Sequence, residues 1–149
     1  MLGKLNQGQI EELLHTQVVG RIGCHHAGKT YVVPITYVYD GEHIIGHTQD
    51  GMKIHIMREN PYVCFEIDKV DNMANWESVI TWGLYEELQG YDARLAMQKL
   101  INRMLPVMID ETHIPTQGME THLLDTGGIK VIVYRIKLLE KTGRFEKHF

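Results

Sequence analysis

Strand-like runs separated by tight turns recur along this chain, and they restrict its possible folds more than any other feature. The runs are rich in valine, isoleucine, threonine and tyrosine, which suit a pleated, half-buried surface. Six such runs lie at residues 18–24, 30–39, 43–48, 62–70, 79–88 and 129–139. Two of the turns, Ala27-Gly28-Lys29 and Asp40-Gly41, are short enough to favour hairpins. A parallel sheet would need a helix between nearly all strands, so we expect an antiparallel barrel.

Two helices are predicted in the first half of the chain. Asn6 can cap the first one, whose buried stripe is formed by Ile10, Leu13 and Leu14. Residues 51–59 are ambiguous, because their apolar residues alternate as in a strand and also pair as in a helix. Asn60-Pro61 directly after this stretch favours a short helix.

The clearest helix begins with Asp92 as its cap, and we expect Pro106 to end it. Residues from about 107 to 128 are predicted to form an irregular connection, and the residues after 139 a charged tail. Pro34 interrupts the second strand-like run, which indicates an edge position or a bulge. Residues 1–149 are therefore predicted to form a single domain, mainly β with helices packed outside it (α+β).

Composition excludes several classes of function. Hydrophobic residues make up 44% of the chain and charged residues 23%, and the net charge of −4 has scattered basic residues, which indicates no nucleic-acid surface. No apolar run is long enough to cross a membrane, and residues 1–6 are too short and polar for a signal peptide. Cys24 and Cys64 lack CxxC spacing and are expected to be reduced thiols. We expect a cytoplasmic protein.

Lys53 is the first residue with a chemical interpretation. Gly46 and Gly51 have the glycine spacing of a P-loop, but the P-loop interpretation fails because Met52 takes the place of its lysine. A lysine in the first turn of a short helix, near Thr48, can still bind a phosphate through free backbone N–H groups and its own charge. Spacing alone favours the alternative, that Lys53 is a solvated surface lysine.

The nine histidines do not have the spacing of a metal site. His43 and His47 share one face of a strand, but they lack the cysteine, aspartate or further histidine partners that zinc requires. His47 directly precedes Thr48 and is the histidine expected to line a cofactor pocket. Haem binding through such a histidine is a minor alternative. Ser78 is the only serine, and nothing marks a base next to it.

Several segments follow one another in an order that resembles a known family. These are residues 48–53, the apolar run 62–67, the stretch Trp76–Gly83 and the closing run 134–138. Together they resemble the pyridoxamine 5'-phosphate oxidase-like, FMN-binding split-barrel family, and within it the nitroimidazole-resistance-type branch. The resemblance covers roughly residues 16–140. It implies a six-stranded antiparallel split β-barrel of Greek-key type with peripheral helices, and a homodimer with FMN at the subunit interface.

The resemblance also implies which residues hold the FMN phosphate. Members of the family carry a threonine, then an arginine–lysine pair, at the positions of Thr48, Met52 and Lys53. Thr48, Gln49 and Lys53 are thus the expected phosphate residues. Met52 stands where the family has its arginine, and Arg21 is the nearest candidate for the missing contact.

The flavin ring is expected to lie against two other segments. The resemblance places the backbone of Pro34, Ile35, Thr36 and Tyr37 along the edge of the isoalloxazine ring. Because Pro34 has no N–H, the hydrogen bonds would come from its neighbours. Trp76 and Ser78 match the family's Trp-x-Gln motif, whose glutamine hydrogen-bonds the flavin. A serine reaches less far, so a water molecule can bridge the gap.

The resemblance implies an oxidoreductase of nitroreductase type, but its substrate and reductant are not indicated. Residues 121–130 contain no arginine, whereas enzymes that oxidise pyridoxamine phosphate carry an arginine- and histidine-rich segment there. The alternative is a non-catalytic module that binds a flavin, haem or another small ligand, and the absence of the phosphate arginine favours it. A purely structural barrel dimer is the third possibility.

Overall fold

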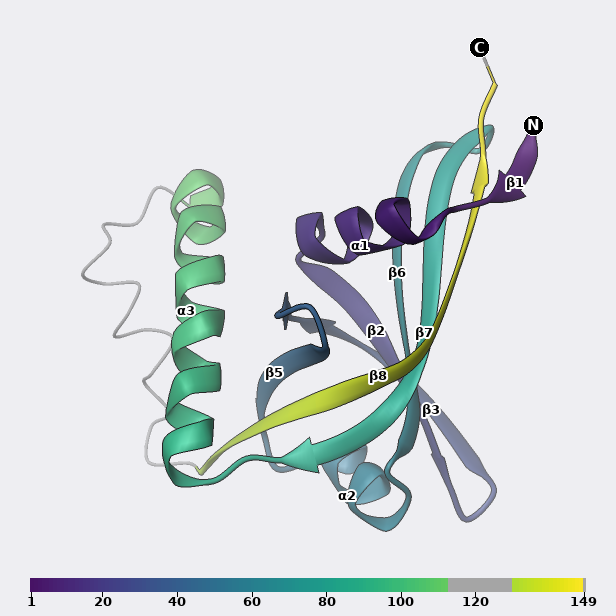
Figure 1. Ribbon diagram of the computed structural model, residues 1–149. Coiled ribbons are helices and arrows are strands. Elements are labelled where there is room, and N and C mark those ends of the chain that lie inside the picture. The colour runs from purple at the N-terminus through teal and green to yellow at the C-terminus, as the bar shows by residue number, and fades with distance from the viewer. Residues whose placement is uncertain (113–129, 149) are drawn as a thin grey trace.

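The computed structural model describes residues 1–112 and 130–148, and strands dominate it (Figure 1). In chain order the elements are β1 (Leu2–Lys4), α1 (Gln7–Thr16), β2 (Val19–His26), β3 (Lys29–Thr36), β4 (Val38–Tyr39), β5 (His43–Gln49), α2 (Met52–Glu59), β6 (Tyr62–Asn72), β7 (Asn75–Glu87), α3 (Gly90–Thr112) and β8 (Val131–Glu146). The expected class, mainly antiparallel β with helices, is confirmed.

One curved sheet contains all the strands. Its order is β3-β2-β6-β7-β8-β5-β4, with β1 paired to the end of β8, and every pairing is antiparallel. β6, β7 and β8 are sequential neighbours, while β5 lies beside β8, which is the Greek-key arrangement. β3 and β4 end the sheet and are not paired with each other, so the barrel is split between them. The expected edge position of Pro34 is confirmed.

Four sequence predictions need correction. α3 continues past Pro106 to Thr112, because a proline ring removes one hydrogen bond of a helix without necessarily ending it. β7 begins at Asn75 rather than Val79, and the predicted second strand is divided into β3 and β4. The predicted charged tail belongs to β8, where its charged residues alternate with Gly143 and Phe145, which pack near α1 and β1. Most of the connection predicted over residues 107–128 lies outside the described residues.

The core fills the inside of the barrel, and α1 covers one end of it (Figure 1). Leu13 and Leu14 of α1 are buried, as predicted, and Asn6 caps the helix in a capping box with Gln9. Tyr37 is fully buried next to Phe65, and its hydroxyl donates to the carbonyl of Leu14 at 2.8 Å. Tyr37 therefore connects the end of β3 to α1.

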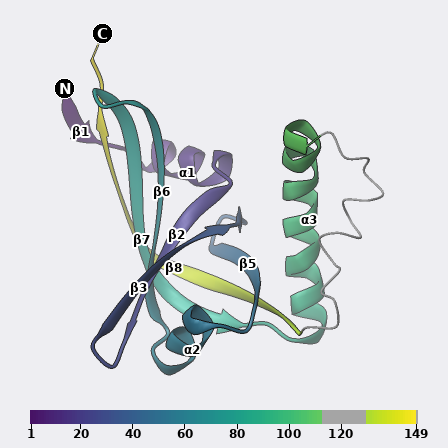
Figure 2. The ribbon, with the colours of Figure 1, turned by 180° about the vertical axis from the view of Figure 1, so that it is seen from behind.

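The other two helices occupy different places. α2 follows β5 and packs mainly against β2, which places it at the end of the barrel opposite α1. α3 stands beside the sheet, as Figure 2 shows from behind, and packs on β5 and β8 through a small separate cluster. Ile45, Leu88, Ala96 and Leu100 are the buried members of that cluster. No helix in the described part of the chain has both the length and the apolar character needed to cross a membrane.

Candidate functional site

The free edge of β3 exposes unpaired backbone groups. The N–H of Tyr37 donates to the carbonyl of Val18, so in this antiparallel pair alternate residues of β3 point their backbone groups toward β2. The remaining ones, Val32, Pro34 and Thr36, point their backbone groups away from the sheet. Pro34 therefore costs the sheet no hydrogen bond. The free edge offers the carbonyl of Pro34 followed by the N–H of Thr36.

The start of α2 forms a small cationic recess. The ammonium of Lys53 is half-buried and donates to the hydroxyl of Thr48 at 2.9 Å. Among the described residues, no carboxylate lies within ion-pairing distance of it. Burial lowers the pKa of Lys53. Gly51 occupies the N-cap position and has no side chain to cap the helix, so the first N–H groups of α2 remain available.

His47 lies next to this recess. Burial and the charge of Lys53 both lower the pKa of its imidazole, so His47 is neutral at physiological pH. Its Nδ1 atom is enclosed and has no hydrogen-bond partner in the described structure. A buried polar atom without a partner is costly, and a ligand with a suitable donor or acceptor would satisfy it.

The recess and the free edge of β3 lie along one path. α2, which carries Lys53, packs against β2, and Cys24 of β2 is paired with Tyr31 of β3. From Tyr31 to Pro34 and Thr36 the strand rises about 10–17 Å, at about 3.3 Å per residue. A ligand with an anionic group in the recess, joined by a short chain to a flat ring at the free edge of β3, could therefore occupy both places.

A second polar cluster lies on the outer face of the sheet. Nη1 of Arg21 is 3.4 Å from Glu66 and 3.3 Å from Asp68. The hydroxyl of Ser78 donates to Glu66 at 3.1 Å. Burial and the neighbouring Asp68 raise the pKa of Glu66. Because the hydroxyl of Ser78 donates to Glu66, its oxygen can accept a further hydrogen bond from a ligand or partner.

The predicted site residues thus fall into two separated groups. Pro34 pairs with Arg21, Arg21 with Glu66, and Glu66 with Ile80, so three strand spacings separate the edge of β3 from the neighbourhood of Ser78. That distance is about 14 Å. Within one subunit, the structure does not bring Ser78 to the same ring edge as Pro34.

The remaining predicted residues have other surroundings. Arg21 lies beside the carboxylates of Glu66 and Asp68 on the outer face of the sheet. The side chain of Tyr37 belongs to the core, and only its backbone continues the edge of β3. The indole N–H of Trp76 donates to Glu146 at 3.2 Å. Gln49 is exposed at the end of β5, and Ile35 is partly buried against the core.

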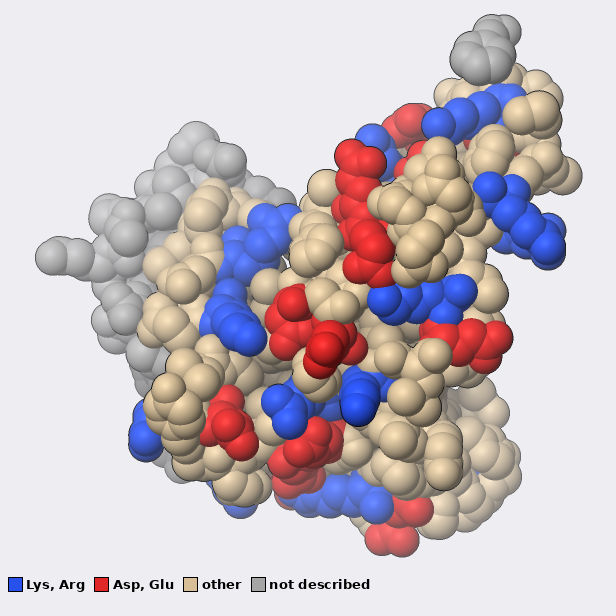
Figure 3. Space-filling view, in the orientation of Figure 1, with Lys and Arg blue, Asp and Glu red and all other residues tan. Residues whose placement is uncertain are grey.

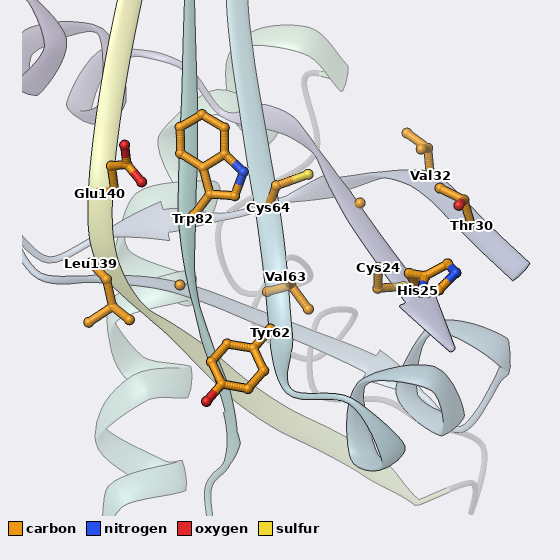
Figure 4. A pocket seen from close by; sticks show the side chains of 12 residues that line it. Cys24, His25, Thr30, Val32, Tyr62, Val63, Cys64, Trp82, Leu139 and Glu140 are labelled. Atoms are coloured by element: carbon orange, nitrogen blue, oxygen red, sulfur yellow. The ribbon is translucent and has the colours of Figure 1, made fainter. Parts of the chain in front are cut away.

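An apolar trough crosses the outer face, with a volume of about 480 Å³ (Figure 4). Its floor is Gly23, where a Cβ atom would lie 2.6 Å from the sulfur of Cys64. Trp82 and Tyr62 project from β7 and β6 on one side, and Val32 lies on β3 across from them (Figure 4). Trp82 is 41% exposed and Val32 63%, which is high for large apolar side chains in a free protein.

Sequence reasoning missed Glu66, Asp68 and Arg58. The signal for the first two was their alternation with Phe65 and Ile67 in the run 62–70, which places both carboxylates on the outer face. Arg58 had no such signal, because its importance depends on a contact with Asp50 across α2.

Charges of both signs are intermingled on the surface seen in Figure 3, without a large basic patch on that face. Within residues 1–112 and 130–148, no group of three or more histidine, cysteine or acidic residues could hold a metal ion. Both cysteines are free thiols.

Comparison with known proteins gives a family match over most of the chain. The family profile of pyridoxamine 5'-phosphate oxidase matches residues 6–144. An uncharacterized protein of Rhizobium meliloti is 36% identical over 70 residues, which are 47% of this chain and 46% of that protein. The chain therefore matches less than half the length of this relative.

Solved structures with the same fold include three with informative descriptions. An FAD-binding protein from Mesorhizobium loti is 25% identical, with a TM-score of 0.74 and 99% of each chain covered. A candidate 5-nitroimidazole antibiotic resistance protein from Bacteroides thetaiotaomicron is 18% identical, with a TM-score of 0.72 over 97% of this chain and 87% of that one. An FAD and heme binding protein from Mycobacterium smegmatis is 12% identical, with a TM-score of 0.73 over 99% and 74%.

Proposed function

Because the chain belongs to the pyridoxamine 5'-phosphate oxidase family, we propose that it binds FMN as a homodimer and acts as a flavin-dependent oxidoreductase. The observation that carries the proposal is the half-buried ammonium of Lys53, which holds Thr48 and has no carboxylate partner in the described structure. A buried cation without a counter-ion is costly. A phosphate group would supply the missing negative charge.

The recess suits a phosphate in a second respect. The N–H groups at the start of α2 are available to bind an anion, and the helix dipole favours negative charge there. Lys53 and Thr48 would hold the phosphate, and the flavin's ribityl chain would lead from it toward β3. The charge at this site favours FMN over riboflavin, which carries no phosphate.

The free edge of β3 suits the ring. The pyrimidine part of a flavin presents an N–H between two carbonyl groups. The carbonyl of Pro34 can accept from that N–H, and the N–H of Thr36 can donate to one of the carbonyls. The second carbonyl would find no donor at Pro34. This accords with the relatives named as flavin-binding.

The ring supplies the electron and hydride transfer chemistry, and the chain positions it. Ser78 would contact the ring with an oxygen whose hydrogen-bonding direction depends on Glu66. While Glu66 is ionised, Ser78 accepts from the outside, and protonation of Glu66 would let Ser78 donate outward.

The separation of the two residue groups supports the homodimer. Ser78 and the edge of β3 lie about 14 Å apart in one subunit, so one ring can meet both only if they come from different copies. The outer face that carries Ser78 also exposes apolar side chains. Val32 is 63%, Leu139 61%, Trp82 41% and Ile80 40% exposed. A two-fold contact through this face would cover them. The free thiols of Cys24 and Cys64 are consistent with a cytoplasmic location.

Binding of FMN and riboflavin tests the cofactor assignment. We expect the purified protein to bind FMN more tightly than riboflavin, and Lys53→Ala to weaken FMN binding by roughly 1–3 kcal/mol, the scale of a charged hydrogen-bond partner. Quenching of flavin fluorescence during titration measures both affinities. Lys29→Ala, at an exposed position in the β2–β3 hairpin, is the matched control and should change neither. Equal wild-type affinities for the two flavins would refute the phosphate site.

A non-catalytic flavin or haem-binding module is the second candidate, and Met52 in place of the family's arginine favours it. Reoxidation of the chemically reduced, FMN-loaded protein distinguishes the two. As an oxidoreductase, it should pass electrons to a nitroaromatic acceptor under anaerobic conditions faster than free reduced FMN does. A rate no higher than that of free flavin, across several acceptors, would favour the binding module.

A further inference from the structure

We propose that Arg58 supplies the second cation for the flavin phosphate, in place of the arginine that Met52 replaces. This inference rests on the proposed function. Arg58 lies in the last turn of α2, and its Nη1 atom reaches back to within 3.7 Å of Asp50 in the segment before the helix. Asp50 lies two residues after Thr48 and three before Lys53. The guanidinium therefore lies next to the loop that would enclose the phosphate.

The contacts of Arg58 leave it able to turn toward a ligand. Its Nε atom donates to Glu87 at the end of β7, and this bond holds the pKa of Glu87 below its ordinary value. Nη1 is engaged only at 3.7 Å, with a carboxylate whose side chain is 70% exposed. An exposed ion pair of this length contributes little, so a dianionic phosphate can displace Asp50. The hydrogen bond from Nε to Glu87 would remain while the phosphate replaces Asp50.

Arg58 also fits better than the other arginine considered. Arg21 is held by two carboxylates on the outer face of the sheet. Side chains on a helix lean toward its N-terminus, which is the direction that Arg58 takes. Asp50 would also affect binding, because its carboxylate repels the phosphate and competes with it for the guanidinium of Arg58. Arg58 and Asp50 together would then set the preference for a phosphorylated flavin.

Opposite substitutions test this arrangement in the full-length protein. The measured quantity is selectivity, the ratio of the riboflavin dissociation constant to the FMN dissociation constant, at low salt. We expect Arg58→Gln to reduce selectivity about tenfold, as for loss of a charge-assisted hydrogen bond, with riboflavin binding unchanged. Asp50→Asn should increase selectivity by about threefold, because it removes a repulsive charge. Arg58→Lys should recover part of the loss.

Two controls separate this role from a structural one. Arg94→Gln makes the same change of charge at an exposed position on α3 and should leave selectivity unchanged. Glu87→Gln keeps an oxygen that can accept from Nε of Arg58 and removes only the charge of the carboxylate, so selectivity should stay near that of the wild type. The inference is overturned if Glu87→Gln lowers selectivity as much as Arg58→Gln, or if Arg58→Gln weakens riboflavin and FMN binding equally.

The proposed function can fail independently of this inference. If the wild type does not prefer FMN, the phosphate site itself is wrong, and Arg58 has no phosphate to bind. If the wild type prefers FMN and Lys53→Ala removes that preference, while Arg58→Gln leaves it intact, the phosphate site stands and the role of Arg58 is refuted.

Discussion

The recess at the start of α2 and the outer face of the sheet differ in whether their cation has carboxylate partners. In the recess, Lys53 is half-buried, and its one hydrogen-bond partner among the described residues is the neutral Thr48. On the outer face, Arg21 meets two carboxylates, and Ser78 satisfies one of them. The first arrangement is incomplete without an anion, whereas the second is already balanced within one chain. A site that stabilises the free protein poorly is thus the better indication of a ligand.

The two regions also differ in what would complete them. The recess calls for a small anion, while the outer face presents exposed apolar side chains around its balanced polar cluster. Desolvation of a charge is costly unless it is paired, but the burial of apolar surface is favourable. We therefore propose that a ligand occupies the recess and that a second copy of the chain covers the face.

The largest effect is expected at the outer face. Ile80→Glu would place a carboxylate in the centre of the apolar surface, near Glu66 and its own copy across a two-fold axis. A buried unpaired charge costs about 3 kcal/mol or more, so the proposed dimer should dissociate at micromolar concentration. Light scattering measures the change in mass from the dimer to the 17.2 kDa monomer.

Tyr91→Glu is the matched control for Ile80→Glu, because Tyr91 is an apolar residue 66% exposed on α3, outside the face. It should leave the dimer intact. If the wild-type protein is monomeric under the same conditions, the proposed dimer contact through the outer face is refuted, whereas the proposed phosphate site in the recess is not.

The second prediction concerns the stability of the ligand-free protein after either cation, Lys53 or Arg21, is replaced. Lys53→Met removes a partly desolvated charge that has no counter-ion within residues 1–112 and 130–148, so we expect the free energy of unfolding to rise by about 0.5–1 kcal/mol. Arg21→Met leaves two neighbouring carboxylates without a cation and should lower it by up to about 1 kcal/mol, since these groups are partly exposed. Urea denaturation at pH 7 gives both values. Changes of the same sign in the two variants would contradict the contrast between the regions.

The smallest effect concerns pH. The folded-state pKa of Glu66 is raised, by burial and by Asp68, so the folded protein binds its proton more tightly than the unfolded chain. This contribution to stability is present below the ordinary carboxyl pKa of 4.5 and is lost as pH rises through the folded-state pKa. Glu66→Gln should therefore be slightly more stable than the wild type at pH 7, by less than about 0.5 kcal/mol because solvent screens the group.

Denaturation at several pH values follows that difference. The advantage of Glu66→Gln should diminish as pH falls toward 4.5, where Glu66 of the wild type is itself protonated. Glu77→Gln, on β7 and paired to Lys147, is a suitable control. An advantage of Glu66→Gln that increases on acidification would contradict the raised pKa.

Much of the local structure was determined by the sequence. The alternation of apolar residues in the run 62–70 specifies which side of β6 is buried, because successive side chains of a strand point to opposite faces. Asn6 specifies the start of α1 through a local hydrogen bond to the backbone of Gln9. The order of the phosphate-like and Trp-x-Ser segments was also sufficient to indicate the family. These signals involve residues close together in the chain.

Only the tertiary structure decided how the candidate residues are grouped. Arg21 and Ser78 are far apart in sequence, and the pairing of β2, β6 and β7 brings both to Glu66. The same strand order places Ser78 three strands away from the edge of β3, and a contact across α2 brings Arg58 to Asp50. Strand order and the reach of a long side chain depend on contacts between distant segments. Periodicity in one segment carries no information about such contacts, so the partners of Lys53 and Arg21 could be identified only in the folded chain.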